Sequence, residues 1–298
     1  AGRCNDARAP NRAGPAFAMS IHLVIQGSAV AERDLEQLAQ LSGARQVLRL
    51  GPGVCRLIGA RQRPGIAEYC ARARLDFGFV PEERKLADMK LLVIDMDSTL
   101  ISIECIDEIA DMAGVRTEVS AITAAAMGGE IDYAESLRQR VGLLQGLDEG
   151  ALARVYDERL RFSPGAEAML AAMRRAGVKT LLVSGGFSFF TERLKTRLDL
   201  DYSVSNVLDI ENGRLTGRVI EGLVDAEAKA SMLRSVRDEL GITRAGIIAI
   251  GDGANDMAMM AEAGVAIAYR AKAVARSKAD YALDWVGLDG ALNLFSEN

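Results

Sequence analysis

A chain of 298 residues is long enough for about two domains, and a hydrophobic content of 49% is sufficient to build their cores. The formal net charge of -5, without clustering of basic and aromatic residues, argues against a nucleic-acid partner. No apolar run approaches the roughly eighteen residues of a membrane span, so we expect no membrane partner either.

The few cysteines and histidines limit the chemistry. The cysteines are Cys4, Cys55, Cys70 and Cys105. Their spacing is not that of a metal site, and we interpret them as reduced thiols of a cytoplasmic protein. The one histidine, His22, lies far along the chain from the polar motifs below, so acid and base catalysis must fall to carboxylates. Residues 1–18 lack an apolar segment, and we expect a flexible tail there rather than a signal peptide.

Residues 19–82 are predicted to form a small α+β domain. Apolar runs and turn residues predict strands at 21–26, 46–50, 54–58 and 77–80 and helices at 32–41 and 64–74. This βαββαβ order resembles a ferredoxin-like or ACT-like domain. The usual ACT ligand loop, an acidic residue shortly before a glycine, is absent from Gly27-Ser28-Ala29-Val30. We therefore expect a homodimer formed through this domain rather than amino-acid sensing.

Two carboxylates follow the next apolar run. Leu91-Leu92-Val93-Ile94 predicts a buried strand, and Asp95-Met96-Asp97-Ser98-Thr99 comes directly after it. Alternate side chains of an extended segment lie on one face, so Asp95 and Asp97 can serve one site as nucleophile or metal ligand and as acid/base. An isolated pair of this kind is more often two turn-forming aspartates, so further motifs are needed.

Residues from about 103 to 160 have helical character and predict a cap inserted over the sheet. One helical face carries Glu104, Asp107, Glu108 and Asp111. By itself this pattern is typical of a solvated acidic face on an amphipathic helix. Met127-Gly128-Gly129 predicts a turn, after which the helical pattern resumes at 133–141.

Three further features follow the cap. Ser184-Gly185-Gly186 ends the apolar run 178–183, and such a loop lets backbone N–H groups approach an anion. Gly251-Asp252-Gly253-Ala254-Asn255-Asp256 ends the run 247–250 and supplies the hard oxygen ligands that Mg²⁺ prefers. Between them, Lys229 lies in a predicted helix at 225–240, where a lysine is usually solvated.

Residues 88–298 alternate between strand and helix patterns. This order predicts an α/β fold, a Rossmann-like, mostly parallel three-layer sheet with the helical cap over its carboxyl edge, where ligands of such sheets bind. Ser163-Pro164 predicts the start of a helix that ends at Gly177. Residues 207–210 and 215–220 predict a β-hairpin.

Taken in order, DxDST, SGG, Lys and GDGxND resemble the haloacid dehalogenase superfamily of aspartate-nucleophile phosphotransferases, and within it the phosphoserine phosphatase family. After Thr99 the chain continues Leu-Ile-Ser-Ile-Glu-Cys-Ile-Asp-Glu-Ile-Ala, which places Glu104 where that family reads the substrate amine. Met96 replaces the commoner aromatic residue and is expected to point into the core. The resemblance covers roughly residues 90 to 290.

The resemblance implies Mg²⁺-dependent hydrolysis of O-phosphoserine to serine and phosphate, the last step of serine biosynthesis, through an aspartyl phosphate. It implies that Asp95 is the nucleophile and Asp97 the acid/base. Mg²⁺ would be held by Asp95, Asp252 and the backbone carbonyl of Asp97, with Asp256 behind them. The implied substrate-binding residues are Glu104, Met127, Tyr133, Arg140, Ser184, Gly185, Lys229 and Asn255. For the arginine that clamps the substrate carboxylate, the residues alone leave Arg138 as an equal candidate.

Two other functions remain open. A phosphoserine:homoserine phosphotransferase, or a phosphatase for another small metabolite, would keep the core motifs and differ in the cap. An amino-acid-binding regulator with a decayed catalytic core belongs to a different class. The set Asp95, Asp97, Ser184, Lys229 and Asp252 is complete in this chain, which argues against the regulator.

Overall fold

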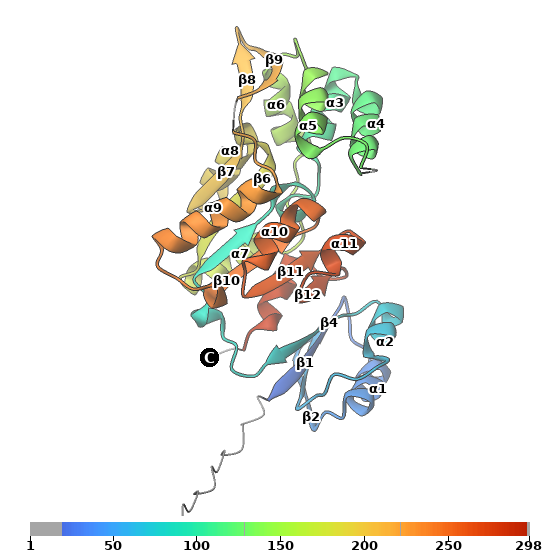
Figure 1. Cartoon of the computed structure of the whole chain (residues 1–298). Coiled ribbons are helices and arrows are strands. Elements are labelled where there is room, and N and C mark those ends of the chain that lie inside the picture. Colours follow the sequence, from blue (N-terminus) through green and yellow to red (C-terminus); the bar gives the residue numbers. More distant parts are fainter. Residues whose placement is uncertain (1–19, 128, 221, 297–298) are drawn as a thin grey trace, which may run out of the picture.

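The computed structural model describes residues 20–127, 129–220 and 222–296. The expected tail at residues 1–18 lies outside this part of the chain. Figure 1 shows a small N-terminal sheet at the bottom, a larger sheet in the middle and a mostly helical cap at the top. Among the described residues, no helix is long and apolar enough to cross a membrane.

The N-terminal domain is an antiparallel sheet with two helices on one face. Its elements are β1 Ile21–Gln26, α1 Glu32–Ser42, β2 Gln46–Gly51, β3 Val54–Ile58, α2 Ile66–Ala73 and β4 Asp76–Pro81. The strand order β2-β3-β1-β4 confirms the expected ferredoxin-like, ACT-like arrangement. Leu23 and Ile25 of β1 pack against the helices, because alternate side chains of a strand point to the same face.

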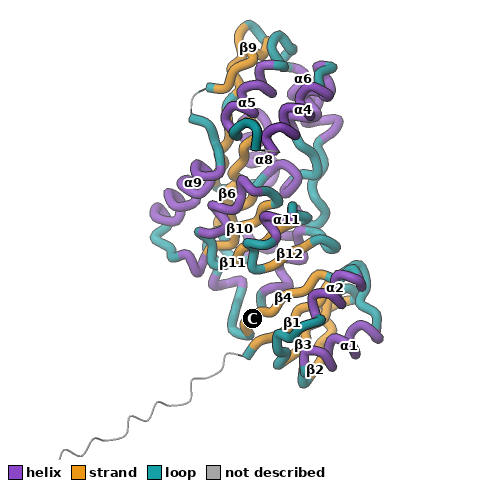
Figure 2. The backbone as a smooth tube through the Cα atoms, turned by 45° about the vertical axis from the view of Figure 1, so that its right-hand side comes forward, coloured by secondary structure: helices purple, strands orange, loops and turns teal. Residues whose placement is uncertain are grey.

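The larger domain is built on six parallel strands in the order β12-β11-β10-β5-β6-β7. Their bounds are β5 Leu91–Ile94, β6 Lys179–Phe187, β7 Tyr202–Asn206, β10 Ile247–Gly251, β11 Val265–Tyr269 and β12 Tyr281–Leu283. Central strand β5 is buried on both faces. Such a strand requires a layer of helices on each side, as Figure 2 shows.

Alternation along β5 separates the two helical layers. Leu91 and Val93 face one layer, and Leu92 and Ile94 face the other. The first layer contains α9 Ala226–Glu239 and α10 Met257–Ala261, and the second contains α7 Ala166–Arg175 and α8 Ser188–Leu198. A short helix, α11 Ala273–Arg276, lies between β11 and β12. The expected three-layer α/β architecture is confirmed.

The expected start of α7 at Ser163-Pro164 is wrong. The helix begins at Ala166, after Gly165 with φ of 76°, a residue that has no side chain to cap it. Ser163 instead uses its carbonyl to accept the N–H of Ala166 at 3.1 Å, and the carbonyl of Pro164 accepts the N–H of Leu288 at 2.7 Å. The local signal failed because these backbone groups are committed to a turn and to a distant part of the chain.

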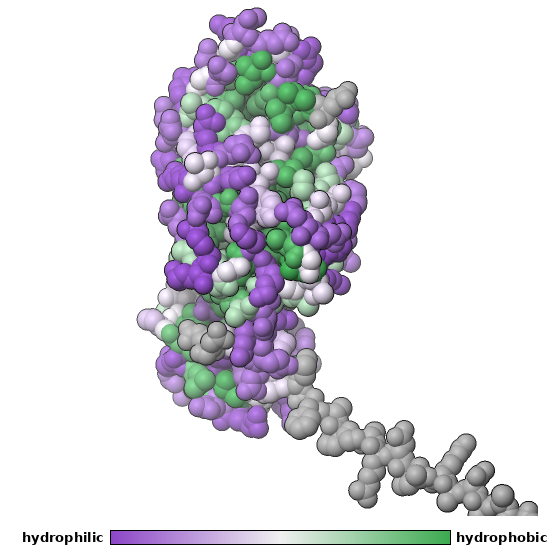
Figure 3. Space-filling view, turned by 90° about the vertical axis from the view of Figure 1, so that its left-hand side faces the viewer, coloured by the Kyte–Doolittle hydropathy of each residue, from purple (hydrophilic) through white to green (hydrophobic). Residues whose placement is uncertain are grey.

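The cap consists of helices and a hairpin that come from separate parts of the sequence. Its helices are α3 Cys105–Ala113, α4 Arg116–Met127, α5 Tyr133–Gly142 and α6 Gly150–Arg154, and its hairpin is β8 Leu208–Glu211 with β9 Arg214–Val219. Leu215 of the hairpin exchanges backbone hydrogen bonds with Gly146 and Leu147. Exposed apolar side chains occur here (Leu143, Val207, Ile210 and Ile220), and Figure 3 shows apolar patches at this end of the molecule.

The N-terminal domain packs directly on the larger domain. Val80 of β4 is buried in the same apolar cluster as Leu294. The carboxylate of Asp76 accepts the N–H groups of residues 284, 285 and 286 at 2.9 to 3.0 Å. Arg56 donates to the carbonyl oxygens of Asn293 and Phe295 at 2.9 and 2.7 Å. The two domains therefore share apolar and polar contacts in addition to the connection between them.

Candidate active site

The three motif-bearing strands β5, β6 and β10 belong to one parallel sheet, so their carboxyl ends lie at the same edge. This edge brings together Asp95, Ser184 and Asp252, which are separated by up to 157 positions in the chain. A cavity of about 850 Å³ opens between this edge and the cap. Its lining includes Asp95, Asp97 and Asn255 from the core and Glu104, Tyr133 and Arg140 from the cap.

The turn after β5 has an unusual backbone. Ser98 has φ of 57°, a left-handed conformation that is uncommon for a residue with a Cβ. The turn is held by the N–H of Ser98, which donates to the carbonyl of Ile103 at 3.1 Å. The N–H of Cys105 donates to Oδ1 of Asp97 at 3.0 Å. These bonds stabilise a strained turn that presents both aspartates to the cavity.

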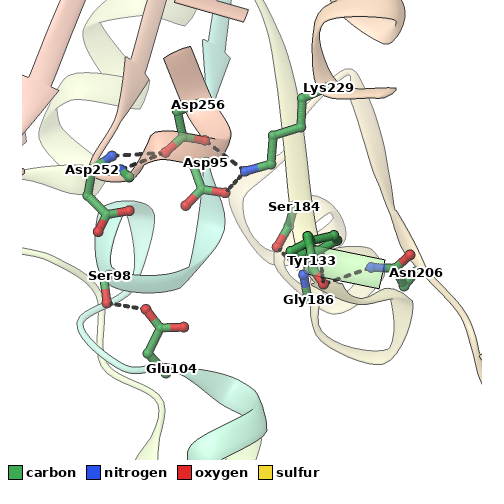
Figure 4. A network of polar contacts seen from close by, with 12 residues as sticks. Asp95, Ser98, Glu104, Tyr133, Ser184, Gly186, Asn206, Lys229, Asp252 and Asp256 are labelled. Carbon is green, nitrogen blue, oxygen red and sulfur yellow. Dashed lines mark hydrogen bonds and ion pairs between the residues drawn. The ribbon is translucent and has the colours of Figure 1, made fainter. Parts of the chain in front are cut away.

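Lys229 lies in a buried ionic cluster. Its ammonium contacts Oδ1 of Asp95 and lies 2.8 Å from Oδ1 of Asp256 (Figure 4). The second oxygen of Asp256 accepts the N–H groups of Asp252 and Gly253 at 3.1 and 3.0 Å. Lys229 has no exposed surface, so the usual interpretation of a helical lysine as solvated is wrong here. It reaches the cluster because α9 packs on the sheet with this residue facing the carboxyl edge.

Asp225 is the N-cap of α9. Oδ1 of Asp225 accepts the N–H of Ala228 at 2.8 Å, as an N-cap side chain does. Lys229 is one turn into this helix, so the N-cap hydrogen bond of Asp225 helps to set where the lysine side chain enters the cluster.

Burial and mutual repulsion dominate the acidity of these groups. Burial, followed by the charge of Asp256, raises the pKa of Asp95 well above its ordinary value and that of Asp252 to about 6. Burial, followed by the charge of Glu104, raises the pKa of Asp97 to about 7. Burial alone would lower the pKa of Lys229, but the carboxylates of Asp256 and Asp95 raise it above the usual range. The site therefore carries excess negative charge.

The donor set fits a divalent cation. One oxygen from each of Asp95, Asp252 and Asp256 lies within 4.8 Å of the others, and all three residues are buried. Hard carboxylate oxygens are the ligands that Mg²⁺ prefers, and a divalent charge would balance the surplus that Lys229 leaves. The two oxygens of Asp256 already bind Lys229 and backbone N–H groups, so it is better placed to orient the others than to bind a metal directly.

The glycines near the carboxyl end of β6, where its pairing with β7 is irregular after Val183, are required by close approach. A Cβ on Gly186 would lie 2.6 Å from Oδ2 of Asp97, and one on Gly185 would collide with the hydroxyl of Tyr133. The N–H of Gly186 donates to Oγ of Ser184 at 2.8 Å. The end of β6 therefore brings backbone N–H groups and a buried serine hydroxyl next to the aspartates, in an arrangement suited to an anion.

Helix termini and one helical face position the groups on the cap side. Glu104 precedes α3, and its Oε1 accepts the hydroxyl of Ser98 at 2.7 Å (Figure 4). Arg140 of α5 lines the cavity, whereas Arg138 is 62% exposed and lies 3.9 Å from Glu135 on the surface. The backbone of Met127 ends α4, but its side chain lies outside the described part of the structure. The structure thus brings Glu104, Tyr133 and Arg140 together and leaves Arg138 apart.

Several cavity residues were not anticipated from the sequence. The expected solvated acidic face is wrong for Asp107, which lines the cavity, while Glu108 and Asp111 pair with Arg159 at 2.7 and 2.6 Å. Ser136 and Leu137 also line the cavity. The spacing of positions 133, 136, 137 and 140 on one helical face was the signal that could have identified these two. Lys272 also lines the cavity, whereas Asn206 is not part of the lining and binds the carbonyl of Gly185; neither had a comparable local signal.

Comparisons with known proteins agree with this geometry. Residues 92–261 match the model of the haloacid dehalogenase-like hydrolase family, and residues 23–66 match that of a domain of unknown function. A phosphoserine phosphatase of Albidiferax ferrireducens is 53% identical over 223 residues, which are 73% of this chain and 94% of the relative.

Two solved structures extend the likeness to three dimensions. The unliganded form of a probable phosphoserine phosphatase from Vibrio cholerae has a TM-score of 0.81 and 35% identity over 92% of this chain and 85% of that one. A phospho-aspartyl intermediate analogue of phosphoserine phosphatase has a TM-score of 0.66 and 37% identity over 70% of this chain and 99% of that one. Because the family model covers more than half of the chain and a relative matches along nearly its whole length, this protein belongs to the phosphoserine phosphatase family of haloacid dehalogenase-like hydrolases.

Proposed function

We propose that this protein hydrolyses O-phospho-L-serine to L-serine and phosphate, as the last step of serine biosynthesis. The observation that carries the proposal is the charge distribution of the cavity, which has Asp95 and Ser184 at the sheet edge and Glu104 and Arg140 on the cap, with buried Lys229 in contact with Asp95. A carboxylate and a guanidinium suit the ammonium and carboxylate of an amino acid, and the sheet edge suits its phosphate.

The same residues support a two-step mechanism. In the first step a carboxylate oxygen of Asp95 attacks phosphorus, the bond from phosphorus to the seryl oxygen breaks, and protonated Asp97 gives its proton to that oxygen. In the second step Asp97, now a carboxylate, takes a proton from water, which attacks phosphorus and releases phosphate from Asp95. The elevated pKa of Asp97 supports its role as the acid of the first step.

The remaining groups would bind and orient the phosphoryl oxygens. Lys229, Ser184 and the backbone N–H of Gly185 would supply positive charge and hydrogen bonds, with Asn255 beside them. We propose that Mg²⁺ is held by Asp95, Asp252 and the carbonyl of Asp97, with Asp256 in support. When bound, Mg²⁺ would supply charge that offsets the phosphoryl oxygens. Tyr133 and Met127 would complete the pocket on the cap side.

The domain organisation, assembly and location are also proposed. Residues 19–82 would form the accessory domain and residues 88–298 the phosphatase domain. Strand β2 is an edge strand with Val47, Leu48 and Leu50 exposed, which supports a homodimer through the N-terminal domain. The described cysteines, Cys55, Cys70 and Cys105, are free thiols, which supports a cytoplasmic location.

The decisive experiment is turnover of O-phosphoserine by the purified protein in Mg²⁺ buffer, with phosphothreonine and glycerol phosphate as comparison substrates. We expect serine and phosphate to be released at equal rates, with loss of activity on chelation. Addition of homoserine tests the phosphotransferase alternative, because a transferase would need the acceptor. Acid quenching followed by mass spectrometry should place a phosphate on Asp95. A phosphate on Ser98, Thr99 or Ser184 would contradict the mechanism.

A further inference from the structure

The peptide group between Gly185 and Gly186, near the carboxyl end of β6, is held by partners on both sides. The carbonyl oxygen of Gly185 accepts the side-chain amide of Asn206 at 2.7 Å and the hydroxyl of Tyr133 at 3.2 Å. The N–H at the other end of this peptide, on Gly186, donates to Oγ of Ser184 at 2.8 Å. Figure 4 shows the side chains of Tyr133, Asn206 and Ser184 meeting beside this end of the strand. Rotation of this peptide would break all three bonds, so its orientation is fixed.

Asn206 itself has a defined orientation. It ends β7 with 2% of its surface exposed, and its Oδ1 accepts the N–H of Val224 at 2.8 Å. The amide nitrogen must therefore face Gly185. In an inverted amide, the NH₂ group would face the N–H of Val224, and the oxygen would face the carbonyl oxygen of Gly185. Val224 directly precedes Asp225, the cap of the helix that carries Lys229. One buried amide thus connects the end of β6 to the irregular segment that leads into this helix.

This arrangement determines how the Ser184 hydroxyl can be used. A serine hydroxyl has one proton to donate and can accept through its lone pairs. Since Gly186 donates to Ser184, the hydroxyl proton remains for another acceptor, and the hydrogen bonds of the described residues give it none. Ser184 lines the cavity, where a phosphoryl oxygen is such an acceptor.

We propose that Asn206 and the hydroxyl of Tyr133 are positioning residues for phosphoryl transfer. By fixing the peptide between Gly185 and Gly186, they hold Ser184 with its proton directed at the transferring phosphoryl group. Tyr133 is on the cap, whereas Asn206 is on the core. The hydrogen bond from the Tyr133 hydroxyl to the carbonyl of Gly185 therefore forms only when the cap is closed. The inference rests on the proposed function, since it assigns Ser184 to a phosphate monoester.

Two conservative variants test these contacts. Asn206→Asp keeps the shape and can accept from Val224, but it has no N–H for Gly185. Tyr133→Phe keeps the ring and removes the hydroxyl. We expect kcat to fall about tenfold to a hundredfold for Asn206→Asp and about threefold to tenfold for Tyr133→Phe, with KM changed less than threefold. Tyr202→Phe is the matched control, because that hydroxyl binds Glu239 on the exposed surface. We expect wild-type kinetics for it.

A double-mutant cycle with Ser184→Ala separates positioning from general support of the fold. If both residues act through Ser184, each variant should lower kcat less than twofold in the Ser184→Ala background. Equal losses in both backgrounds would overturn the inference and place their effect elsewhere, for example through Val224 and the Lys229 helix. Should Asn206→Asp fail to fold, the cycle of Tyr133→Phe with Ser184→Ala decides.

Every variant is assayed on both O-phosphoserine and p-nitrophenyl phosphate, so that the two proposals fail separately. A wild type that hydrolyses the aryl phosphate but not phosphoserine would contradict the proposed function, and the cycle would still be measurable. A wild type that hydrolyses phosphoserine, combined with independent losses in the cycle, would contradict only the positioning role.

Discussion

The charged residues buried in the active site carry more negative than positive charge. Lys229 faces Asp95 and Asp256, and Asp252 adds a third buried carboxylate. Burying charge is costly unless it is paired, so this cluster lowers the stability of the metal-free fold. The same imbalance favours a divalent cation. The proton on Asp97 has a different origin, because burial and the charge of Glu104 raise the pKa of that carboxyl.

The pH dependence of the first chemical step should depend on the leaving group. The folded pKa of Asp97, about 7, lies above its ordinary value of 3.8, so the proton is held below pH 7 and lost above it. Single-turnover formation of phosphoenzyme from phosphoserine should therefore slow about tenfold per unit above pH 7. With p-nitrophenyl phosphate, whose leaving group needs no proton, the rate should stay flat. The same decline with both substrates would mean that another group is titrating.

Replacement of Lys229 should make stability depend on metal. Lys229→Met removes an ammonium from between two buried carboxylates, and we expect the free energy of unfolding to fall by about 3 to 5 kcal/mol in chelator. Mg²⁺ should restore more stability to this variant than to the wild type, because it supplies the missing positive charge. Urea unfolding with and without MgCl₂ measures both effects, with exposed Lys278→Met as control. Equal responses to Mg²⁺ would argue against a metal at this cluster.

Among the elements, α5 contributes the largest share of the cap residues that line the cavity. Tyr133, Ser136, Leu137 and Arg140 share one of its faces and line the cavity. The hairpin β8–β9 packs against this helix although it follows it by more than sixty residues. The cap is therefore completed by a segment inserted between β7 and α9, and its return strand leads towards Asp225 and Lys229. Cap and phosphate site are built from the same connections.

The two arginines of α5 offer a matched pair of variants. Arg140→Ala should lower kcat/KM for phosphoserine by a factor equivalent to about 1 to 3 kcal/mol of transition-state stabilisation, because it removes the proposed partner of the substrate carboxylate. The loss should be much smaller on p-nitrophenyl phosphate, which has no such group. Arg138→Ala should leave both activities unchanged, since that side chain is on the surface. Equal losses of Arg140→Ala on both substrates would instead indicate that Arg140 supports the cap.

The whole molecule is held together at the C-terminal end of the larger domain. Val24 and Val80 of the N-terminal sheet are buried in one apolar cluster with Tyr281, Leu294 and Phe295. Around them, Asp76 and Arg56 bind backbone groups of residues 284–295. None of the described residues 20–82 lines the cavity, so the contact of the N-terminal domain supports the fold from the side opposite the cap.

Removal of the N-terminal domain should separate stability from catalysis. A fragment of residues 82–298 keeps every proposed site residue but exposes the shared cluster, so we expect a clearly lower thermal midpoint with phosphatase activity retained at low temperature. In the full chain, Asp76→Ala should cost about 1 to 3 kcal/mol, because it leaves three N–H groups without their acceptor. Sedimentation of both proteins also tests the proposed dimer, which the fragment should not form. A fragment as stable as the full chain would contradict the packing described here.

The sequence by itself determined the local elements and the main chemistry. Three apolar runs are followed by Asp95, by Ser184 and by the segment with Asp252. This pattern was sufficient to predict parallel strands whose carboxyl ends share a site, because strand burial and turn chemistry are local properties. Met96 is buried, as expected from its place between the two aspartates. The N-cap at Asp225 was equally predictable from residue type and spacing.

Only the tertiary structure decided contacts that depend on which surfaces meet. The sequence pattern favours a solvated Lys229, but the packing of α9 on the sheet buries its ammonium against Asp95 and Asp256. The sequence gives no sign that Asn206 has a role, but the position of β7 places its amide against the carbonyl of Gly185. Helical spacing puts Arg138 and Arg140 on different sides of α5, but it cannot say which side faces the cavity. Periodicity reports that a face is buried, whereas the partner of that face is set by long-range packing that leaves no local trace in the sequence.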